Sequence, residues 1–184
     1  MKLVPTASQT VGPFFRIGLG HLCEGPATQQ GRVVSVHGRV LDAEGKPVPD
    51  AVLELWQANP EGHYAVDRAT VDVSGRAAGF ARIATDESGA FQFCRCMPGA
   101  VAFDDTAMQA PHIVVLVFAR GLMRHLITRM YFPGEPGNES DPILQSIAEE
   151  RRGTLIARSE SRSSDELEWD VVLQGAGETV FFAW

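Results

Sequence analysis

Apolar and polar residues alternate over several short segments of the chain, and this alternation predicts β-strands. Residues 33–40 are rich in β-branched side chains, and residues 51–58 alternate between apolar and polar positions. Residues 41–50, which lie between them, contain the aspartate, glycine and proline residues typical of a turn. The two strands and their turn predict a hairpin-like unit at the start of a β-sandwich.

Further segments with strand-like composition follow at short intervals. They are residues 84–94 (a turn, then a strand), 112–119, 125–132, 155–158 and 167–173. The run 112–119 is almost continuously apolar, which is typical of a strand buried on both faces. Seven or so short strands separated by frequent turns predict an all-β sandwich.

The segments between the strands are expected to be loops, with one helix among them. Residues 59–81 and 100–111 show little apolar periodicity. Asp141 followed by Pro142 has the composition of a helix N-cap and first helical position. We therefore expect one short helix from this point to Glu150.

The two termini differ from the predicted sandwich domain, residues 33–184. Residues 1–32 have no clear period and contain several glycines and prolines, which predicts an irregular N-terminal arm. Its apolar residues must be buried on its own domain or on a partner. Residues 178–184 are rich in aromatic residues and are expected to dock, either in the core or at an interface.

Composition and charge exclude several classes of protein. With 184 residues and 45% hydrophobic residues, the chain is long enough for one domain with a sizeable core. No apolar run approaches the roughly 20 residues of a membrane helix. The net charge of −7 and the absence of a basic stripe argue against nucleic-acid binding. The first residues do not form a secretory signal, so we expect a cytoplasmic protein.

The cysteines predict no disulfide framework. Three are present, Cys23, Cys94 and Cys96, and an odd number without a secretory signal argues against structural disulfides. Cys94 and Cys96 would lie on one face of a strand because side chains alternate. We expect two small thiols that face the core, with a metal or redox pair as the weaker alternative.

An ordered set of segments carries a resemblance to a known family. The segments are residues 8–18, 52–59, 85–89, 97–99, 110–113, 118–121, 126–132 and 175–182. Together they resemble intradiol ring-cleaving dioxygenases of the protocatechuate 3,4-dioxygenase family, and the last segment resembles the C-terminus of that family's alpha chains. The resemblance implies a β-sandwich of the intradiol dioxygenase type and a homologous beta chain as partner.

The resemblance also implies a reaction and a metal. In this family the beta chain binds Fe(III) through two tyrosines and two histidines, and the metal makes a bound catechol reactive toward O2. The implied reaction is cleavage of 3,4-dihydroxybenzoate between its two hydroxyl-bearing carbons, giving 3-carboxy-cis,cis-muconate. The implied partners are therefore an iron-binding beta subunit, an aromatic acid and O2.

The residues of this chain at the implied iron site are poor ligands. Val101 stands where a ligand tyrosine is expected, and Val114 stands where the second of two histidines is expected. His112 is retained, and Gln109 replaces an arginine. The two tyrosines, Tyr64 and Tyr131, resemble structural positions and not ligands. We therefore expect no metal or other cofactor in this chain, and Fe(III) in the partner.

A chain without the metal can still complete its partner's cavity. The resemblance assigns the cavity mouth to four residues of the arm, Thr10, Gly12, Pro13 and Phe14. Arg120 places a permanent cation at the end of a strand, where it can attract a carboxylate. A surface or interface ion pair is the alternative role for Arg120.

Two other functions remain open at this point. The first is a self-sufficient intradiol dioxygenase, which would require iron ligands that the sequence does not provide. The second is a non-enzymatic β-sandwich carrier, because turns such as residues 45–51 occur in many such domains. The arm and the Arg120 turn argue against a carrier.

Overall fold

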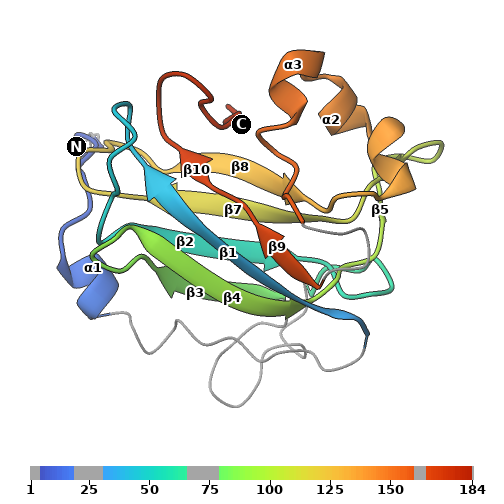
Figure 1. The fold of residues 1–184 in the computed structure, drawn as a ribbon, viewed down its shortest axis with the longest axis horizontal. Coiled ribbons are helices and arrows are strands. Elements are labelled where there is room, and N and C mark those ends of the chain that lie inside the picture. Colours follow the sequence, from blue (N-terminus) through green and yellow to red (C-terminus); the bar gives the residue numbers. More distant parts are fainter. Residues whose placement is uncertain (1–4, 19–30, 66–78, 160–164, 184) are drawn as a thin grey trace, which may run out of the picture.

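The chain folds into a sandwich of two β-sheets (Figure 1). The structure is a computed structural model that describes residues 5–18, 31–65, 79–159 and 165–183. One sheet lies in front of the other in the view of Figure 1, and side chains from both fill the space between them. This architecture confirms the predicted all-β sandwich.

The first sheet is built around β1 (Val33–Leu41). On one side β1 pairs antiparallel with β4 (Ala90–Cys96). On its other side β1 pairs in parallel with β9 (Glu166–Glu168) and β10 (Val171–Val172). The predicted C-terminal strand is therefore two short pieces.

The second sheet has the order β3-β2-β7-β8, and all its neighbours are antiparallel. Its strands are β2 (Val52–Gln57), β3 (Phe80–Ala84), β7 (His112–Phe118) and β8 (Leu126–Tyr131). The first two residues of β3 fall in the predicted loop 59–81, and no strand was predicted for residues 80–84. That prediction was wrong because β3 has an arginine and two alanines and becomes a strand through its pairing with β2.

A small hairpin interrupts the predicted loop 100–111. It consists of β5 (Val101–Ala102) and β6 (Met108–Gln109). Its turn is held by Asp104, whose carboxylate accepts hydrogen bonds from the backbone N–H groups of Thr106 and Ala107. The hairpin fixes Gln109 directly opposite Val101.

The main core lies between the two sheets and is lined by alternate residues of the strands. Its fully buried members include Val36, Val40, Leu53, Leu55, Ile113, Val115, Val117, Met130 and Val171. β7 was expected to be buried on both faces, but the structure buries only one face completely. The other face carries Val114, Leu116 and Phe118, which are only partly buried.

A second, smaller core lies under the helices, at the end of the sandwich opposite α1 (Figure 1). The single predicted helix consists of two one-turn helices, α2 (Pro142–Gln145) and α3 (Glu149–Arg152), and a 3-10 turn (Pro136–Glu139) precedes them. The predicted N-cap is confirmed, because the carboxylate of Asp141 accepts the N–H of Leu144 at 2.7 Å. The helix is broken because Ala148 has extended backbone angles.

The arm and the tail both pack on the domain. The arm was expected to be irregular, but Phe14–Ile17 forms a one-turn helix, α1. The tail is docked as predicted: the N–H of Phe182 donates to the carbonyl of Ile127 at 2.8 Å, and Phe181 packs on the main core. Trp184 lies outside the described residues.

The prediction of two core-facing thiols was wrong. Cys96 is buried, but Cys94 is exposed. The alternation of β4 buries Phe91, Phe93 and Arg95 and leaves Cys94 on the exposed face; only Cys96, at the end of the strand, departs from it. The guanidinium of Arg95 donates a hydrogen bond to the carbonyl of Phe80 at 2.6 Å. Cys23 lies outside the described residues.

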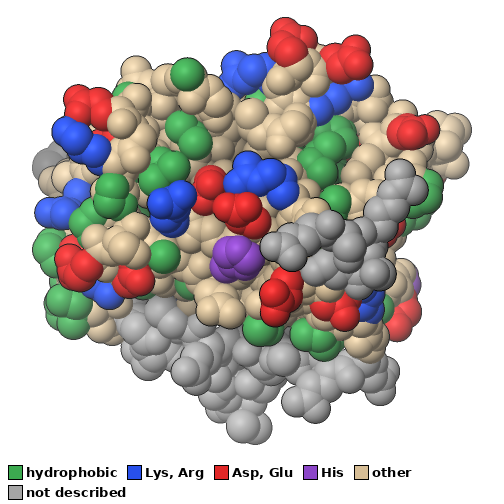
Figure 2. Space-filling model, viewed as in Figure 1, with side chains coloured by type: hydrophobic (Ala, Val, Ile, Leu, Met, Phe, Trp, Pro, Cys, Tyr) green, Lys and Arg blue, Asp and Glu red, His purple; other side chains and the backbone are tan. Residues whose placement is uncertain are grey.

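The exposed face of the first sheet carries charges of both signs (Figure 2). There Arg158 forms ion pairs with Glu168 at 3.3 Å and Asp170 at 3.2 Å. Within the described part of the chain, no helix has the length and apolar character needed to cross a membrane.

Gly38 of β1 tests how closely the first sheet is packed. A Cβ at this position would lie 1.8 Å from the carbonyl oxygen of Trp169. We expect Gly38→Ala to lower the free energy of unfolding by about 2–3 kcal/mol, because the backbone between β9 and β10 must shift. Urea unfolding measures the loss. Gly153→Ala, whose Cβ would have no neighbour within 4 Å, is the control, and an equal effect of both variants would contradict the explanation.

Candidate functional site

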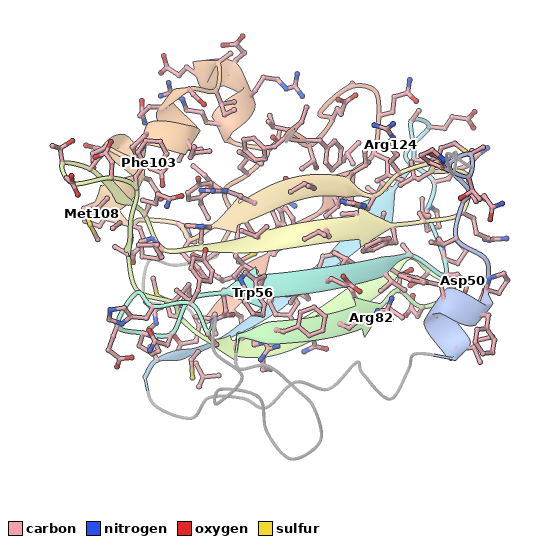
Figure 3. The ribbon with its side chains drawn as sticks, turned by 180° about the vertical axis from the view of Figure 1, so that it is seen from behind. Asp50, Trp56, Arg82, Phe103, Met108 and Arg124 are labelled. Carbon is pink, nitrogen blue, oxygen red and sulfur yellow. The ribbon has the colours of Figure 1, made fainter. Side chains whose placement is uncertain are left out.

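The outer face of the second sheet carries the candidate site residues (Figure 3). Side chains of directly paired residues share a face of an antiparallel sheet. Val114 is paired with Trp56 on one side and Arg129 on the other, and His112 is paired with Tyr131. One face therefore presents imidazole, guanidinium and aromatic groups beside one another.

His112 and Tyr64 form a hydrogen-bonded pair on this face. Nδ1 of His112 lies 2.7 Å from the carbonyl oxygen of Ala110, which can only accept, so Nδ1 carries the proton. Nε2 of the neutral ring then accepts from the hydroxyl of Tyr64 at 3.1 Å. The ring of Tyr64 stacks on Trp56 with centroids 6.2 Å apart. Both nitrogens of His112 are thus engaged within the chain.

Burial keeps this pair neutral. Desolvation, helped by the nearby Arg129 cation, lowers the pKa of His112 from 6.5 to about 4. Desolvation raises the pKa of the Tyr64 phenol, although Arg129 acts in the opposite direction. At neutral pH the site therefore contains an uncharged imidazole and an uncharged phenol.

Arg129 is the centre of a second hydrogen-bond network. Its guanidinium donates to the side-chain oxygen of Gln109 at 2.8 Å and to the hydroxyl of Tyr131 at 3.4 Å. Tyr131 in turn donates to the carboxylate of Asp141 at 3.2 Å, and that carboxylate also accepts the N–H of Ala110. The network joins β6, β8 and the start of α2.

The structure brings the four positions of the implied iron site together. Val114 and His112 lie on β7, and Val101 pairs with Gln109 in the hairpin, which Arg129 ties to β8. Tyr64 was predicted to have no role in the site, yet the hydroxyl of Tyr64 contacts His112.

Arg129 was not among the predicted site residues, although the alternation of side chains along its strand could have indicated it. It lies two residues before Tyr131 on a strand, and residues two apart share a face.

The arm contacts the opposite end of the same sheet. The hydroxyl of Thr10 accepts the N–H of Gly121 at 2.9 Å and lies 3.5 Å from the carbonyl of Ala119. It therefore bridges the two residues that flank Arg120. Arg120 itself is exposed and forms no ion pair within the described parts of the chain.

An aromatic contact anchors the arm beside this bridge. The ring of Phe15 lies 4.1 Å from the guanidinium carbon of Arg82 and 5.0 Å from the ring of Phe118. Arg82 is 2% exposed and pairs with Glu54 at 3.3 Å, so the cation is fixed in the sheet. Figure 3 shows Arg82 on the outer face, on the side of Trp56 nearer to α1.

A groove of about 600 Å³ runs between the arm and the β7–β8 turn. Val11, Leu122 and Met123 are among its apolar lining residues. Gly12, Pro13 and Phe14 are exposed beside it, and the side chain of Phe14 is 77% exposed. The arm residues named by the resemblance therefore gather with Arg120 at one end of the molecule.

The two groups of candidate residues are far apart. Arg120 lies eight positions after His112, which corresponds to about 25 Å along a strand. Figure 3 shows the β5–β6 hairpin residues Phe103 and Met108 at one end, and Arg124 with α1 at the other. The arm and Arg120 thus do not lie beside His112.

Comparisons with known proteins agree with this geometry. A family model described as a dioxygenase matches residues 19–175. The chain is 37% identical to the protocatechuate 3,4-dioxygenase alpha chain of Burkholderia cepacia, over 98% of each chain.

The chain belongs to the intradiol dioxygenase family.

Two other members of the family give further detail. The protocatechuate 3,4-dioxygenase beta chain of Burkholderia cepacia is 36% identical over 81% of this chain and 67% of its own length. The fold is similar to that of hydroxyquinol 1,2-dioxygenase from Pseudomonas putida DLL-E4, with a TM-score of 0.65 and 21% identity. The match covers 82% of this chain and 59% of that longer chain. An alpha chain and a beta chain both match, so the choice between subunits depends on the site.

For an intradiol dioxygenase, the donor set does not fit ferric iron. The site offers two phenols, Tyr64 and Tyr131, and one imidazole, His112. The hydroxyl of Tyr64 is hydrogen-bonded to His112, and the hydroxyl of Tyr131 is hydrogen-bonded to Arg129 and Asp141. Val101 and Val114 have no donor atoms, and Arg129 places a cation beside them. Among the described residues, no group of three or more His, Cys, Asp or Glu residues is arranged to hold a metal.

The lowered pKa of His112 predicts a pH-dependent stability. The unfolded chain binds a proton at His112 below pH 6.5, whereas the folded chain does not until about pH 4. The free energy of unfolding should therefore fall by up to about 1.4 kcal/mol per pH unit as the pH drops through this window. Urea unfolding between pH 7.5 and 4.5 measures the slope.

His112→Asn should remove this contribution to the slope, while His37→Asn, which removes an exposed histidine, controls for the loss of a histidine elsewhere. Identical slopes in wild type and His112→Asn would contradict the role of His112.

Proposed function

We propose that this chain is the iron-free, alpha-type subunit of a protocatechuate 3,4-dioxygenase. The proposed enzyme cleaves 3,4-dihydroxybenzoate with O2 to 3-carboxy-cis,cis-muconate, using Fe(III) held by a homologous beta-type subunit. The observation that carries this proposal is the donor set on β7 and the hairpin. Two valines and a mutually bonded Tyr64–His112 pair leave this chain without a ferric site of its own.

The proposed contribution of this chain is a wall of its partner's cavity. Thr10 fixes the arm to the backbone on both sides of Arg120, and the exposed residues Gly12, Pro13 and Phe14 follow, with Phe14 at the start of α1. An exposed guanidinium without an ion pair in the described chain is suited to a substrate carboxylate. Because this group lies about 25 Å from His112, the cavity that it serves belongs to another subunit.

The apolar surface around α1 supports contact with such a subunit. Phe14 and Ile17 are 77% and 74% exposed, and Met123 is 56% exposed. Large apolar side chains exposed together on a soluble protein mark a protein contact. The proposed beta-type subunit covers this end of the sandwich.

The two alternatives from the sequence have less support. A self-sufficient dioxygenase requires four iron donors, whereas the valines Val101 and Val114 occupy two of the implied ligand positions. A carrier role does not explain a match to a dioxygenase chain over 98% of its length.

Expression with and without a partner tests the subunit role. Produced alone, the chain should be colourless, should hold no stoichiometric iron and should not cleave 3,4-dihydroxybenzoate. Produced with an iron-bearing beta-type homologue, it should co-purify and raise the ring-cleaving activity above that of the homologue alone. Iron analysis, visible absorption and O2 uptake give the answer. A coloured, active chain produced alone would refute the proposal.

Arg120→Ala tests the proposed substrate contact in the assembled enzyme. We expect KM to rise about 10-fold or more, because a charge-assisted hydrogen bond to the carboxylate is lost. Iron content and the visible spectrum should not change. Arg120→Lys should recover part of the loss, and Arg39→Ala removes the same charge from the exposed side of the first sheet as a control. Equal loss of iron would refute the assignment.

A further inference from the structure

Arg129 occupies a position that the proposed iron-free role does not by itself explain. It is the direct cross-strand partner of Val114, where the resemblance places a ligand histidine. Because paired residues share a face, the guanidinium extends over the same surface as the missing imidazole would.

A hydrogen bond also links this cation to the position of the second missing ligand. The guanidinium donates to the side chain of Gln109 at 2.8 Å, and Gln109 is the direct partner of Val101 in the hairpin. Val101 is the position where the resemblance places a ligand tyrosine. One arginine thus spans the distance between the strand of one lost ligand and the hairpin of the other.

The charge of Arg129 also acts on the donors that remain. The guanidinium donates to the hydroxyl of Tyr131, whose ring lies 5.7 Å from that of His112, and His112 is hydrogen-bonded to Tyr64. Within the described residues, no carboxylate forms an ion pair with Arg129. The carboxylate of Asp141 is one hydrogen-bonded step away, behind the hydroxyl of Tyr131.

We propose that Arg129 excludes metal cations from this site, so that restoring the lost ligands is not sufficient to restore metal binding. An arginine stays charged at every accessible pH. Repulsion between a unit charge and a trivalent ion at contact distance is large in a partly buried site. The proposal rests on the iron-free role above, and adds that the site is closed by a positive charge as well as by missing donors.

Variants that restore the ligands separate the two causes. In the ligand-restored chain, Val101→Tyr and Val114→His return one tyrosine and one histidine beside His112, without the second ligand tyrosine, and Arg129 is kept. A second chain adds Arg129→Gln. Both are titrated with Fe(III), and binding is followed by metal content, by the tyrosinate-to-iron absorption band and by the rise in thermal stability. We expect the Arg129→Gln chain to bind Fe(III) at least about 100-fold more tightly.

Two further variants assign the effect to charge. Arg129→Lys on the ligand-restored chain keeps the cation and should bind as weakly as the chain with arginine. Arg129→Met removes the charge with a different side chain and should bind Fe(III) as tightly as Arg129→Gln. Agreement between these two variants also excludes a folding defect of either one as the cause.

The outcomes distinguish this inference from the proposed function. The role of Arg129 would be overturned if the ligand-restored chain and its Arg129→Gln and Arg129→Met variants bound Fe(III) equally, whether tightly or not at all. That result would leave the iron-free role intact. Stoichiometric Fe(III) in the unaltered chain would overturn the iron-free role itself.

Discussion

The pairing of β7 between β2 and β8 is the interaction on which the rest of the structure depends. Each residue of this strand that points inward fills the main core, where Ile113, Val115 and Val117 are fully buried. Because successive side chains alternate, the same pairing fixes His112 and Val114 on the outer face. A shift of one residue would exchange the two sets and would place the imidazole in the core. The register of one strand therefore decides both the stability of the sandwich and the contents of the site.

On the outer face, polar groups are kept because each has a partner. The imidazole of His112 is neutral and bonded at both nitrogens, and the carboxylate of Asp141 accepts three hydrogen bonds. Buried groups that are satisfied in this way are costly to remove, because loss of one partner leaves another unpaired. These polar groups thus stabilise the structure. They join the hairpin, the sheet and the helix α2 at one end of the molecule.

At the other end, the arm is held by contacts of a different kind. Phe15 packs between the guanidinium of Arg82 and the ring of Phe118, and Thr10 bonds to the turn that carries Arg120. These contacts leave Phe14 and Arg120 facing outward. This division of the sheet into a closed end and an open end supports the proposed role, in which the chain has no metal centre of its own and completes that of a partner.

The sequence by itself determined the sandwich, the N-cap at Asp141 and the docked tail, since these follow from alternation and turn composition. The family resemblance added the prediction that iron ligands are missing. The sequence also named Arg120 and the arm as a group, and the chain does bring Thr10 to the Arg120 turn. Only the tertiary structure revealed the strand Phe80–Ala84, the exposed Cys94, the Tyr64–His112 pair and the position of Arg129. These features depend on which residues become neighbours across strands and loops. Such neighbours are set by the register of long-range pairing, which no local pattern along the chain specifies.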